Sequence, residues 1–110
     1  MTGFTIPVVK EGMYSSWAQY TIQLPTQSSD TAQLDYRKRV KAELKESGIP
    51  TNIYYIKPMH KQGAFEGTRS ALADCPVTEQ LCATVLSLPL DPYKTKEDID
   101  FVVAELKKAL

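Results

Sequence analysis

The sequence predicts a small two-layer α+β domain, in which three helices pack on a small, mostly antiparallel sheet of two or three strands. Three observations carry this prediction. Segments with the alternating or β-branched pattern of strands are interleaved with segments whose apolar residues recur at helical spacing. The apolar stripes of the expected helices are narrow and need a second layer to cover them, which a sheet supplies. The length of 110 residues is that of one domain.

The composition excludes several classes of function. The 13 Lys and Arg residues balance the 13 Asp and Glu residues, so no electrostatic footprint favours nucleic acid or an anionic membrane. No window approaches the roughly 20 apolar residues that span a bilayer, and residues 1–10 lack a signal-peptide pattern. One histidine and two cysteines, Cys75 and Cys82, form neither a disulfide framework nor a metal-ligand set. We therefore expect a cytoplasmic protein without a bound metal.

The first expected elements are an irregular lead-in over residues 1–15 and a strand over Ser16–Leu24. Alternation places four side chains of this strand on its core face: Ala18, Tyr20, Ile22 and Leu24. A helix follows, with Asp30 as its expected N-cap and Gln33 as the capping-box partner. Its apolar stripe is formed by Tyr36, Val40 and Leu44. Gly48 gives the usual signal for a helix end.

The middle of the chain changes from a clear strand pattern to no pattern. Thr51–Ile56 is β-branched and aromatic and predicts a second strand. Lys57–Cys75 has no regular pattern, and loops of that length are commonly functional or disordered. We expect this loop to be mobile.

The C-terminal part predicts two helices and a short strand. Pro76 starts a short helix, whose apolar stripe is formed by Val77, Leu81 and Val85. Leu86–Leu90 is a candidate third strand. Thr95 caps the last helix with Asp98 as its capping-box partner. The apolar face of that helix is formed by Ile99, Val102, Val103, Leu106 and Leu110.

The candidate binding residues lie where the second strand ends and the loop begins. Tyr54 and Tyr55 are consecutive, so on a strand one faces the core and the other faces outward. An outward ring and hydroxyl suit a sugar or phosphate partner, and Lys57 adds a cation. His60, the one histidine, stands beside Pro58 at the mouth of the loop, where binding residues concentrate. The alternatives are core packing for one tyrosine and a structural or surface role for His60.

The patterns of other chemistries are missing from the sequence. It contains no glycine-rich phosphate loop and no Ser/His/Asp constellation, and Cys75 has no evident companion base. A solvated helix face explains the charged run Arg37–Lys41. The residues alone therefore predict an α+β domain with one candidate binding corner, and they predict no reaction.

Four blocks of this sequence resemble, in the same order, segments of one protein family. Gly48–His60 resembles the segment written GIPT-x-(I/V)-HYP-x-PLH. Trp17–Ile22 resembles the WAQYTI strand, Pro76–Glu79 the PVAE helix start, and Leu86–Tyr93 the LSLPLHPY turn. Together they cover nearly the whole chain. They are similar to the C-terminal small domain of the DegT/DnrJ/EryC1/StrS family of pyridoxal-phosphate-dependent sugar aminotransferases.

The resemblance implies a fold-type I transferase that uses pyridoxal phosphate to move an amino group, commonly from glutamate, to a nucleotide-linked keto-sugar. Such enzymes serve cell-surface polysaccharide or amino-sugar biosynthesis, and they are homodimers with composite active sites. The Schiff-base lysine would lie in a large domain, residues 1–15 would be the linker, and residues 16–110 the small domain that closes the site. We expect no catalytic residue in this chain, no pyridoxal phosphate bound to it, and no activity from it alone.

Position by position, the resemblance implies four substrate-binding residues: Tyr54, Tyr55, Lys57 and His60. Tyr55 matches the motif Tyr and is expected to hydrogen-bond the substrate, while His60 matches the final His and is expected to line the pocket. The sequence departs from the motifs at Tyr54 and Asp91, where His is usual, and at Ile56, where Pro is usual. The WAQYTI block is most similar to enzymes that act on UDP-linked amino-sugars, such as 3-keto uronates.

Two other functions remain open at this point. A non-catalytic ligand-binding or regulatory module could use the same corner, and it would bind its ligand without any other domain. A structural or dimerisation domain would have no site. Such a domain would tolerate Tyr55→Phe and His60→Ala without loss of activity in the parent protein.

Overall fold

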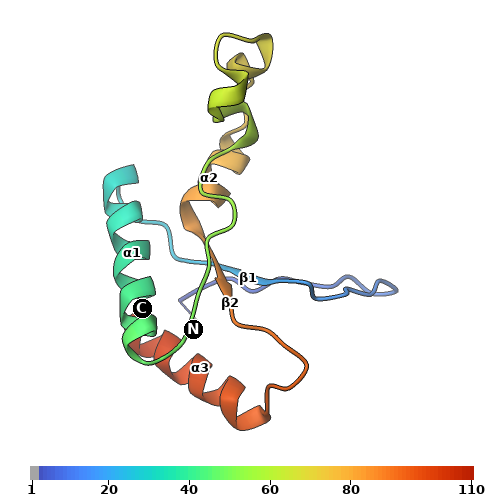
Figure 1. The fold of residues 1–110 in the computed structure, drawn as a ribbon, viewed down its shortest axis with the longest axis vertical. Helices are drawn as coiled ribbons and strands as arrows, with labels where there is room; N and C mark the ends of the chain where they lie inside the picture. Colours follow the sequence, from blue (N-terminus) through green and yellow to red (C-terminus); the bar gives the residue numbers. More distant parts are fainter. Residues whose placement is uncertain (1–2) are drawn as a thin grey trace.

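The computed structural model describes residues 3–110, and the first two residues of the expected lead-in lie outside this range. The described chain contains three α-helices, two strands and three single-turn 3₁₀ helices (Figure 1). In chain order they are β1 (Tyr20–Gln23), α1 (Asp30–Glu46), η1 (Met59–Lys61), η2 (Gly63–Phe65), η3 (Arg69–Leu72), α2 (Pro76–Thr84), β2 (Val85–Leu88) and α3 (Lys96–Ala109). This order confirms the predicted α+β class with three helices.

The sheet consists of β1 and β2, which pair antiparallel with Ile22 opposite Leu86. A single bridge extends each outer edge. Thr5 of the lead-in exchanges two backbone hydrogen bonds of 2.9 Å with Gln23, at the edge of β1. Asn52 exchanges two with Ser87, at the edge of β2. The two paired strands confirm the prediction of a small antiparallel sheet.

The hydrophobic core lies where β1, β2, α1 and α3 meet. Apolar side chains from both strands and both helices form one buried cluster: Ile22, Leu24, Val40, Leu44, Ile49, Leu86, Val102, Leu106 and Ala109. The predicted stripe of α1 is confirmed, because Val40 and Leu44 are fully buried and Tyr36 packs against the cluster. Each buried Val, Leu or Ile side chain of the cluster contributes about 1.5–3 kcal/mol by leaving water.

The N-terminus of α1 differs from the prediction by one residue. Ser29, not Asp30, is the N-cap, and its hydroxyl accepts a hydrogen bond of 3.2 Å from the amide of Ala32. Asp30 instead occupies the first turn, where its charge complements the helix dipole. Gln33 forms no capping box, because its side-chain oxygen accepts the amide of Gln27 at 2.7 Å.

The C-terminus of α1 has the predicted glycine stop. Gly48 has a φ of +77°, a left-handed conformation that side chains other than glycine adopt at a cost. Its amide bonds the carbonyl of Lys45, and the amide of Ile49 bonds that of Leu44 at 2.9 Å. This is a Schellman motif, and its two apolar residues, Leu44 and Ile49, both join the core.

Both long strand predictions were wrong in extent. Of the expected Ser16–Leu24 strand only Tyr20–Gln23 pairs, because β2 offers only four partners and Trp17 has a φ of +50°. Ala18 is therefore exposed and not on a core face. The expected strand Thr51–Ile56 is reduced to the bridge at Asn52, since the chain turns away from the sheet after that residue.

The α2 helix runs directly into β2 without an intervening loop. Pro76 occupies its first turn, as predicted, but the stripe predicted to be buried is not: Val77 and Leu81 are exposed and Val85 belongs to β2. Arg37 of α1 secures the junction, because its buried guanidinium donates to the carbonyl of Cys82 at 2.6 Å and to that of Val85. The solvated helix face predicted for the charged run Arg37–Lys41 was therefore wrong for Arg37. Burial lowers the pKa of Arg37.

The last predicted elements are largely confirmed. β2 begins one residue before the expected strand Leu86–Leu90 and ends at Leu88. Thr95 and Asp98 form the predicted capping box of α3, and Val102 and Leu106 are buried. Ile99, also assigned to the apolar face, is exposed.

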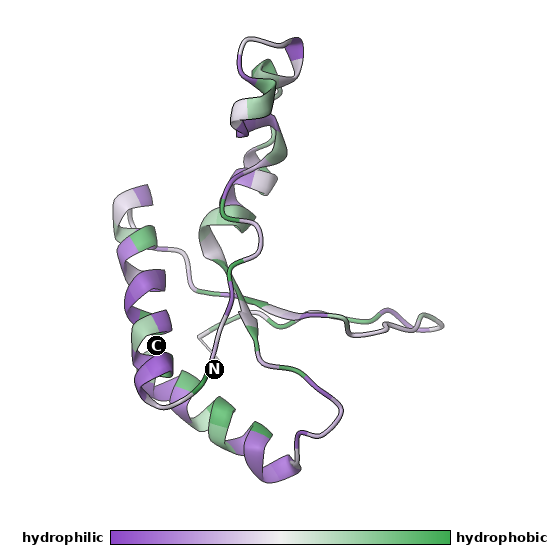
Figure 2. Ribbon diagram, viewed as in Figure 1, coloured by the Kyte–Doolittle hydropathy of each residue, from purple (hydrophilic) through white to green (hydrophobic). Residues whose placement is uncertain are grey.

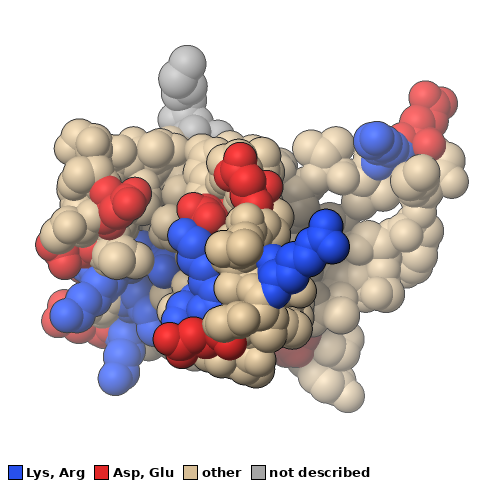
Figure 3. Space-filling model, turned by 90° about the horizontal axis from the view of Figure 1, so that it is seen from above, with Lys and Arg blue, Asp and Glu red and all other residues tan. Residues whose placement is uncertain are grey.

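The molecule projects in two directions from its core. In Figure 1 the segment from α2 through the 3₁₀ turns rises from the sheet, and the lead-in forms an arm that reaches to the side. Figure 2 shows apolar segments along both projections as well as at the core. Positive and negative side chains are interspersed on the face in Figure 3, in line with the zero net charge. None of the helices in the described range is long and apolar enough to cross a membrane.

Candidate functional site

The predicted corner lies where the chain leaves the sheet edge at Asn52. Tyr54 and Tyr55 are both exposed, by 54% and 64%, so the expectation that one of them packs in the core was wrong. Strand alternation does not hold here, because pairing ends at Asn52. The side-chain amide of Asn52 donates to the hydroxyl of Tyr54 at 3.2 Å and so orients that ring.

The two tyrosines and Lys57 line one groove of about 710 Å³ between the corner and α2. We call it the corner groove. Its lining is mostly apolar, with Lys57 as the single charged residue among the lining residues. The lining residues are Thr21, Tyr54, Tyr55, Ile56, Lys57, Pro58, Met59, Gln62, Thr78, Leu81, Cys82 and Val85. The structure therefore brings together three of the four predicted site residues, and it adds Leu81 and Thr78 of α2 as the facing wall.

His60, the fourth predicted residue, does not line the corner groove. It is only 9% exposed, and its Nε2 donates to Oε1 of Glu79 on α2 at 3.1 Å. The ammonium of Lys61 lies 3.0 Å from the same oxygen. These bonds, with that of Lys61 the largest, lower the pKa of Glu79. His60 borders a separate hollow of about 380 Å³ that Lys57 also lines.

A second, more polar pocket of about 300 Å³ lies between the corner and the turn after β2, and we call it the turn pocket. It is lined by Ala18, Gln19, Pro50, Asn52, Tyr54, Ser87, Leu88, Pro89, Leu90, Asp91 and Lys94. The carboxylate of Asp91 accepts the amide of Tyr93 at 2.9 Å and lies 3.2 Å from the ammonium of Lys94. Both interactions lower the pKa of Asp91, the amide bond more strongly.

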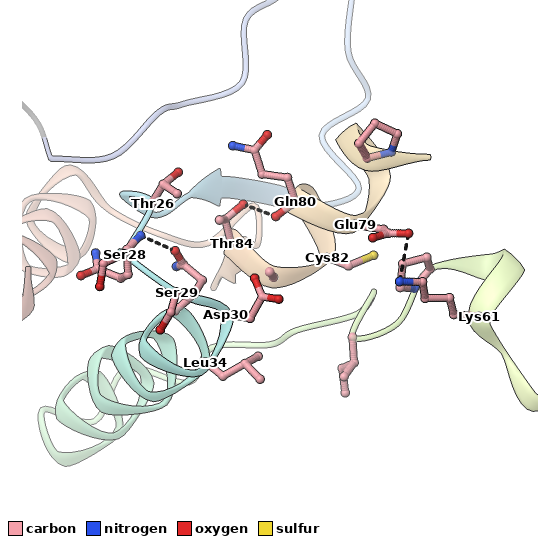
Figure 4. Close-up of a pocket in the computed structure, with 16 residues that line it drawn as sticks. Thr26, Ser28, Ser29, Asp30, Leu34, Lys61, Glu79, Gln80, Cys82 and Thr84 are labelled. Carbon is pink, nitrogen blue, oxygen red and sulfur yellow. Dashed lines mark hydrogen bonds and ion pairs between the residues drawn. The ribbon is translucent and has the colours of Figure 1, made fainter. Parts of the chain in front are cut away.

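A fourth hollow, of about 500 Å³, separates the start of α1 from α2 (Figure 4). Several of its polar groups already bond to other groups of the protein. Thr84 donates to the carbonyl of Gln80 at 2.8 Å, and Glu79 is held by Lys61 (Figure 4). Because these groups are already satisfied, we treat this hollow as the junction between two helices.

Sequence reasoning missed the residues that complete these pockets. Glu79 was noted only as the last residue of the helix start Pro76–Glu79, and only the fold places it against His60. Asp91 was noted only as a departure from the motif, and Lys94 was not noted, whereas the fold places both in one pocket with Asn52. Within residues 3–110 no three His, Cys, Asp or Glu side chains are grouped as metal ligands.

The fold of the chain matches part of a known aminotransferase structure. A solved structure described as a DegT DnrJ EryC1 StrS aminotransferase from Brucella abortus superimposes with a TM-score of 0.76 and 34% identity. The match covers 96% of this chain and 26% of that one. The model of the DegT/DnrJ/EryC1/StrS aminotransferase family matches residues 1–107. The chain belongs to this family.

Two curated relatives carry more specific names. A UDP-2-acetamido-2-deoxy-3-oxo-D-glucuronate aminotransferase from Pseudomonas aeruginosa is 32% identical over 104 residues, which are 94% of this chain and 25% of the relative. A UDP-N-acetyl-3-dehydro-alpha-D-glucosamine 3-aminotransferase from Acidithiobacillus ferrooxidans is 33% identical over 105 residues, 96% of this chain and 25% of the relative. The chain thus spans about a quarter of the length of these relatives.

Proposed function

We propose that residues 16–110 act as the C-terminal small domain of a pyridoxal-phosphate-dependent aminotransferase, joined by residues 1–15 to a larger domain. The enzyme would transfer an amino group, from glutamate, to a nucleotide-linked keto-sugar. Three facts support this proposal: the family match, the names of the relatives, and the quarter of their length that this chain spans. As the resemblance implies, the working enzyme would be a homodimer.

The residues of this chain do not by themselves fit pyridoxal phosphate. The cofactor requires a lysine for its Schiff base, and such lysines work in a desolvated site. No lysine among residues 3–110 is buried, and the half-buried Lys41 is occupied by the carbonyl of Thr51 at 2.6 Å. We therefore assign the cofactor, which would supply the electron sink of the reaction, to the rest of the protein. The chain alone would be inactive.

The corner groove carries the substrate-binding part of the proposal. Tyr54 and Tyr55 offer ring faces and hydroxyls, which bind sugars and bases through stacking and hydrogen bonds. Lys57 offers a point charge for a phosphate group. His60 would help to position these residues, because its hydrogen bond to Glu79 attaches the turn that follows Lys57 to α2.

The test uses the complete polypeptide that carries this chain. Purified protein should show a visible absorption band that borohydride removes, as an internal aldimine does. Tyr55→Phe and Lys57→Gln should each lower kcat/KM for a UDP-linked 3-keto-sugar by about 10-fold, through loss of one hydrogen bond or charge contact. Tyr93→Phe is the matched control, because Tyr93 is 89% exposed and lies outside the groove.

Unchanged kcat/KM in both groove variants would remove the corner groove from the substrate site. Absence of the chromophore would reject the aminotransferase and favour a non-catalytic ligand-binding module.

A further inference from the structure

Tyr54 forms a wall between two pockets of opposite character. On one side is the corner groove, whose lining is mostly apolar and includes one charged residue, Lys57. On the other side is the turn pocket, whose side walls are polar. A nucleotide-linked sugar has the same division, since an aromatic base and charged phosphates are joined to a ring of hydroxyl groups.

The turn pocket has the chemistry of a site for a neutral ring with hydroxyl groups. The charges of Asp91 and Lys94 offset each other at 3.2 Å, so the pocket favours no ionic ligand. Each carboxylate oxygen of Asp91 has two lone pairs and uses one of them for Tyr93 or Lys94. The amide oxygen of Asn52 accepts no hydrogen bond from the described residues. Both side chains can therefore bind hydroxyl groups.

The size and the apolar surface of the pocket agree with this assignment. Its volume of about 300 Å³ is at the lower end of the range for small-molecule sites, which suits a single sugar ring. Leu88 and Leu90 supply apolar surface, and the ring of Tyr54 is held in place by Asn52. Sugar rings present C–H faces to such surfaces while their hydroxyls bond polar groups at the edge.

We propose that the turn pocket binds the sugar ring of the nucleotide-linked substrate and that Asn52 and Asp91 select among sugars. This inference rests on the proposed function and deepens it, because it places the nucleotide on one side of Tyr54 and the sugar ring on the other. Tyr54 and Asp91 are also two of the positions at which this sequence departs from the motifs it resembles. The fold brings both into one pocket although they are distant in sequence.

The experiment measures the affinity of the complete polypeptide for two pairs of probes: UDP-N-acetylglucosamine with UDP, and dTDP-glucose with dTDP. Calorimetry gives, for each pair, the ratio by which the sugar improves binding. Asp91→Asn should lower this ratio by about 10-fold in the pair that binds, with the affinity for the bare nucleotide unchanged. Asn52→Ala should lower the ratio by a similar factor, and it should weaken the bare nucleotide only slightly, through the freed ring of Tyr54 in the corner groove. Asp100→Asn is the matched control, because Asp100 pairs with Lys96 on the surface of α3.

Equal loss of affinity for sugar nucleotide and bare nucleotide would overturn the proposal, and so would an unchanged ratio in both variants. Wild-type protein that gains nothing from the sugar in either pair would overturn it as well. The binding assay requires no turnover. A protein without the aminotransferase chromophore but with the expected ratios would therefore contradict the proposed function and leave the sugar site standing.

Discussion

The packed half of the molecule and its projecting half contain similar apolar residues, which are buried in the first and exposed in the second. In the packed half, formed by β1, β2, α1 and α3, leucines such as Leu86 and Leu106 are fully buried. In the projecting half, Tyr54–Leu81, leucine and methionine side chains such as Leu72 and Met59 lie in solvent. Stability is therefore concentrated in one half, whereas most of the residues that line the corner groove belong to the other. A rigid core that positions a less stable functional region is a common arrangement.

The largest effect that would test this contrast is a cavity in the packed half. Leu86→Ala should lower the free energy of unfolding by about 3 kcal/mol, because Leu86 is 0% exposed and joins the core cluster. Leu72→Ala is the control, since Leu72 is 84% exposed and should change stability by less than about 0.5 kcal/mol. Urea denaturation of both variants measures the difference. Similar losses in the two would contradict a division of stability between the halves.

A smaller effect distinguishes two glycines with the same backbone strain. Gly48 and Gly67 have φ values of +77° and +75°, so alanine is strained at either position. Gly48→Ala should cost about 1 kcal/mol of global stability, because the Schellman motif it closes anchors Ile49 in the core. Gly67→Ala should cost less in the same denaturation experiment, because its segment can open locally. A larger cost at Gly67 would show that the projecting half is folded cooperatively with the core.

The smallest effect concerns pH and the contact between His60 and Glu79. Hydrogen bonds from Lys61 and then His60 lower the pKa of Glu79, so its bonds are intact above the ordinary carboxylate range and are lost as pH falls through the lowered value. Below about pH 4, backbone ¹⁵N NOE values over residues 59–62 should therefore fall, and Glu79→Gln should lower them at neutral pH.

The packed half supplies the control for this titration. Glu105 also has a lowered pKa, caused first by Lys108 and then by Ser47, but it joins α3 to α1. Glu105→Gln should leave the NOE values of residues 59–62 unchanged. If those values stay constant in Glu79→Gln at every pH, Glu79 does not anchor the turn.

Local patterns were sufficient where the structure is decided locally. The capping box of Thr95 and Asp98 and the glycine stop at Gly48 depend on neighbours within one turn, and both were predicted. The N-cap of α1 was misplaced because Ser29 and Asp30 are both good caps. Only the extended backbone of Ser29 decides between them.

Features decided by distant partners were not predictable from the sequence. Tyr54 and Tyr55 were predicted to bind substrate, which stays a prediction, and the structure places both in one groove. Their exposure depends on how far the pairing with Ser87 extends. His60 was selected as a pocket residue, and its bond to Glu79 became visible only when α2 was placed beside the turn. Patterns of hydrophobicity carry no information on where a strand lacks a partner.

The direct passage from α2 to β2 has a consequence for the lengths that this domain can tolerate. Thr84 ends the helix and Val85 begins the strand, so no extra residue separates the helical repeat of 3.6 residues per turn from the two-residue repeat of the strand. One residue inserted there would exchange the two faces of β2 and bring Leu86 out of the core. We therefore expect the domain to tolerate an inserted residue better in the segment 62–74, whose short 3₁₀ turns lie at the surface and away from the sheet, than at this junction.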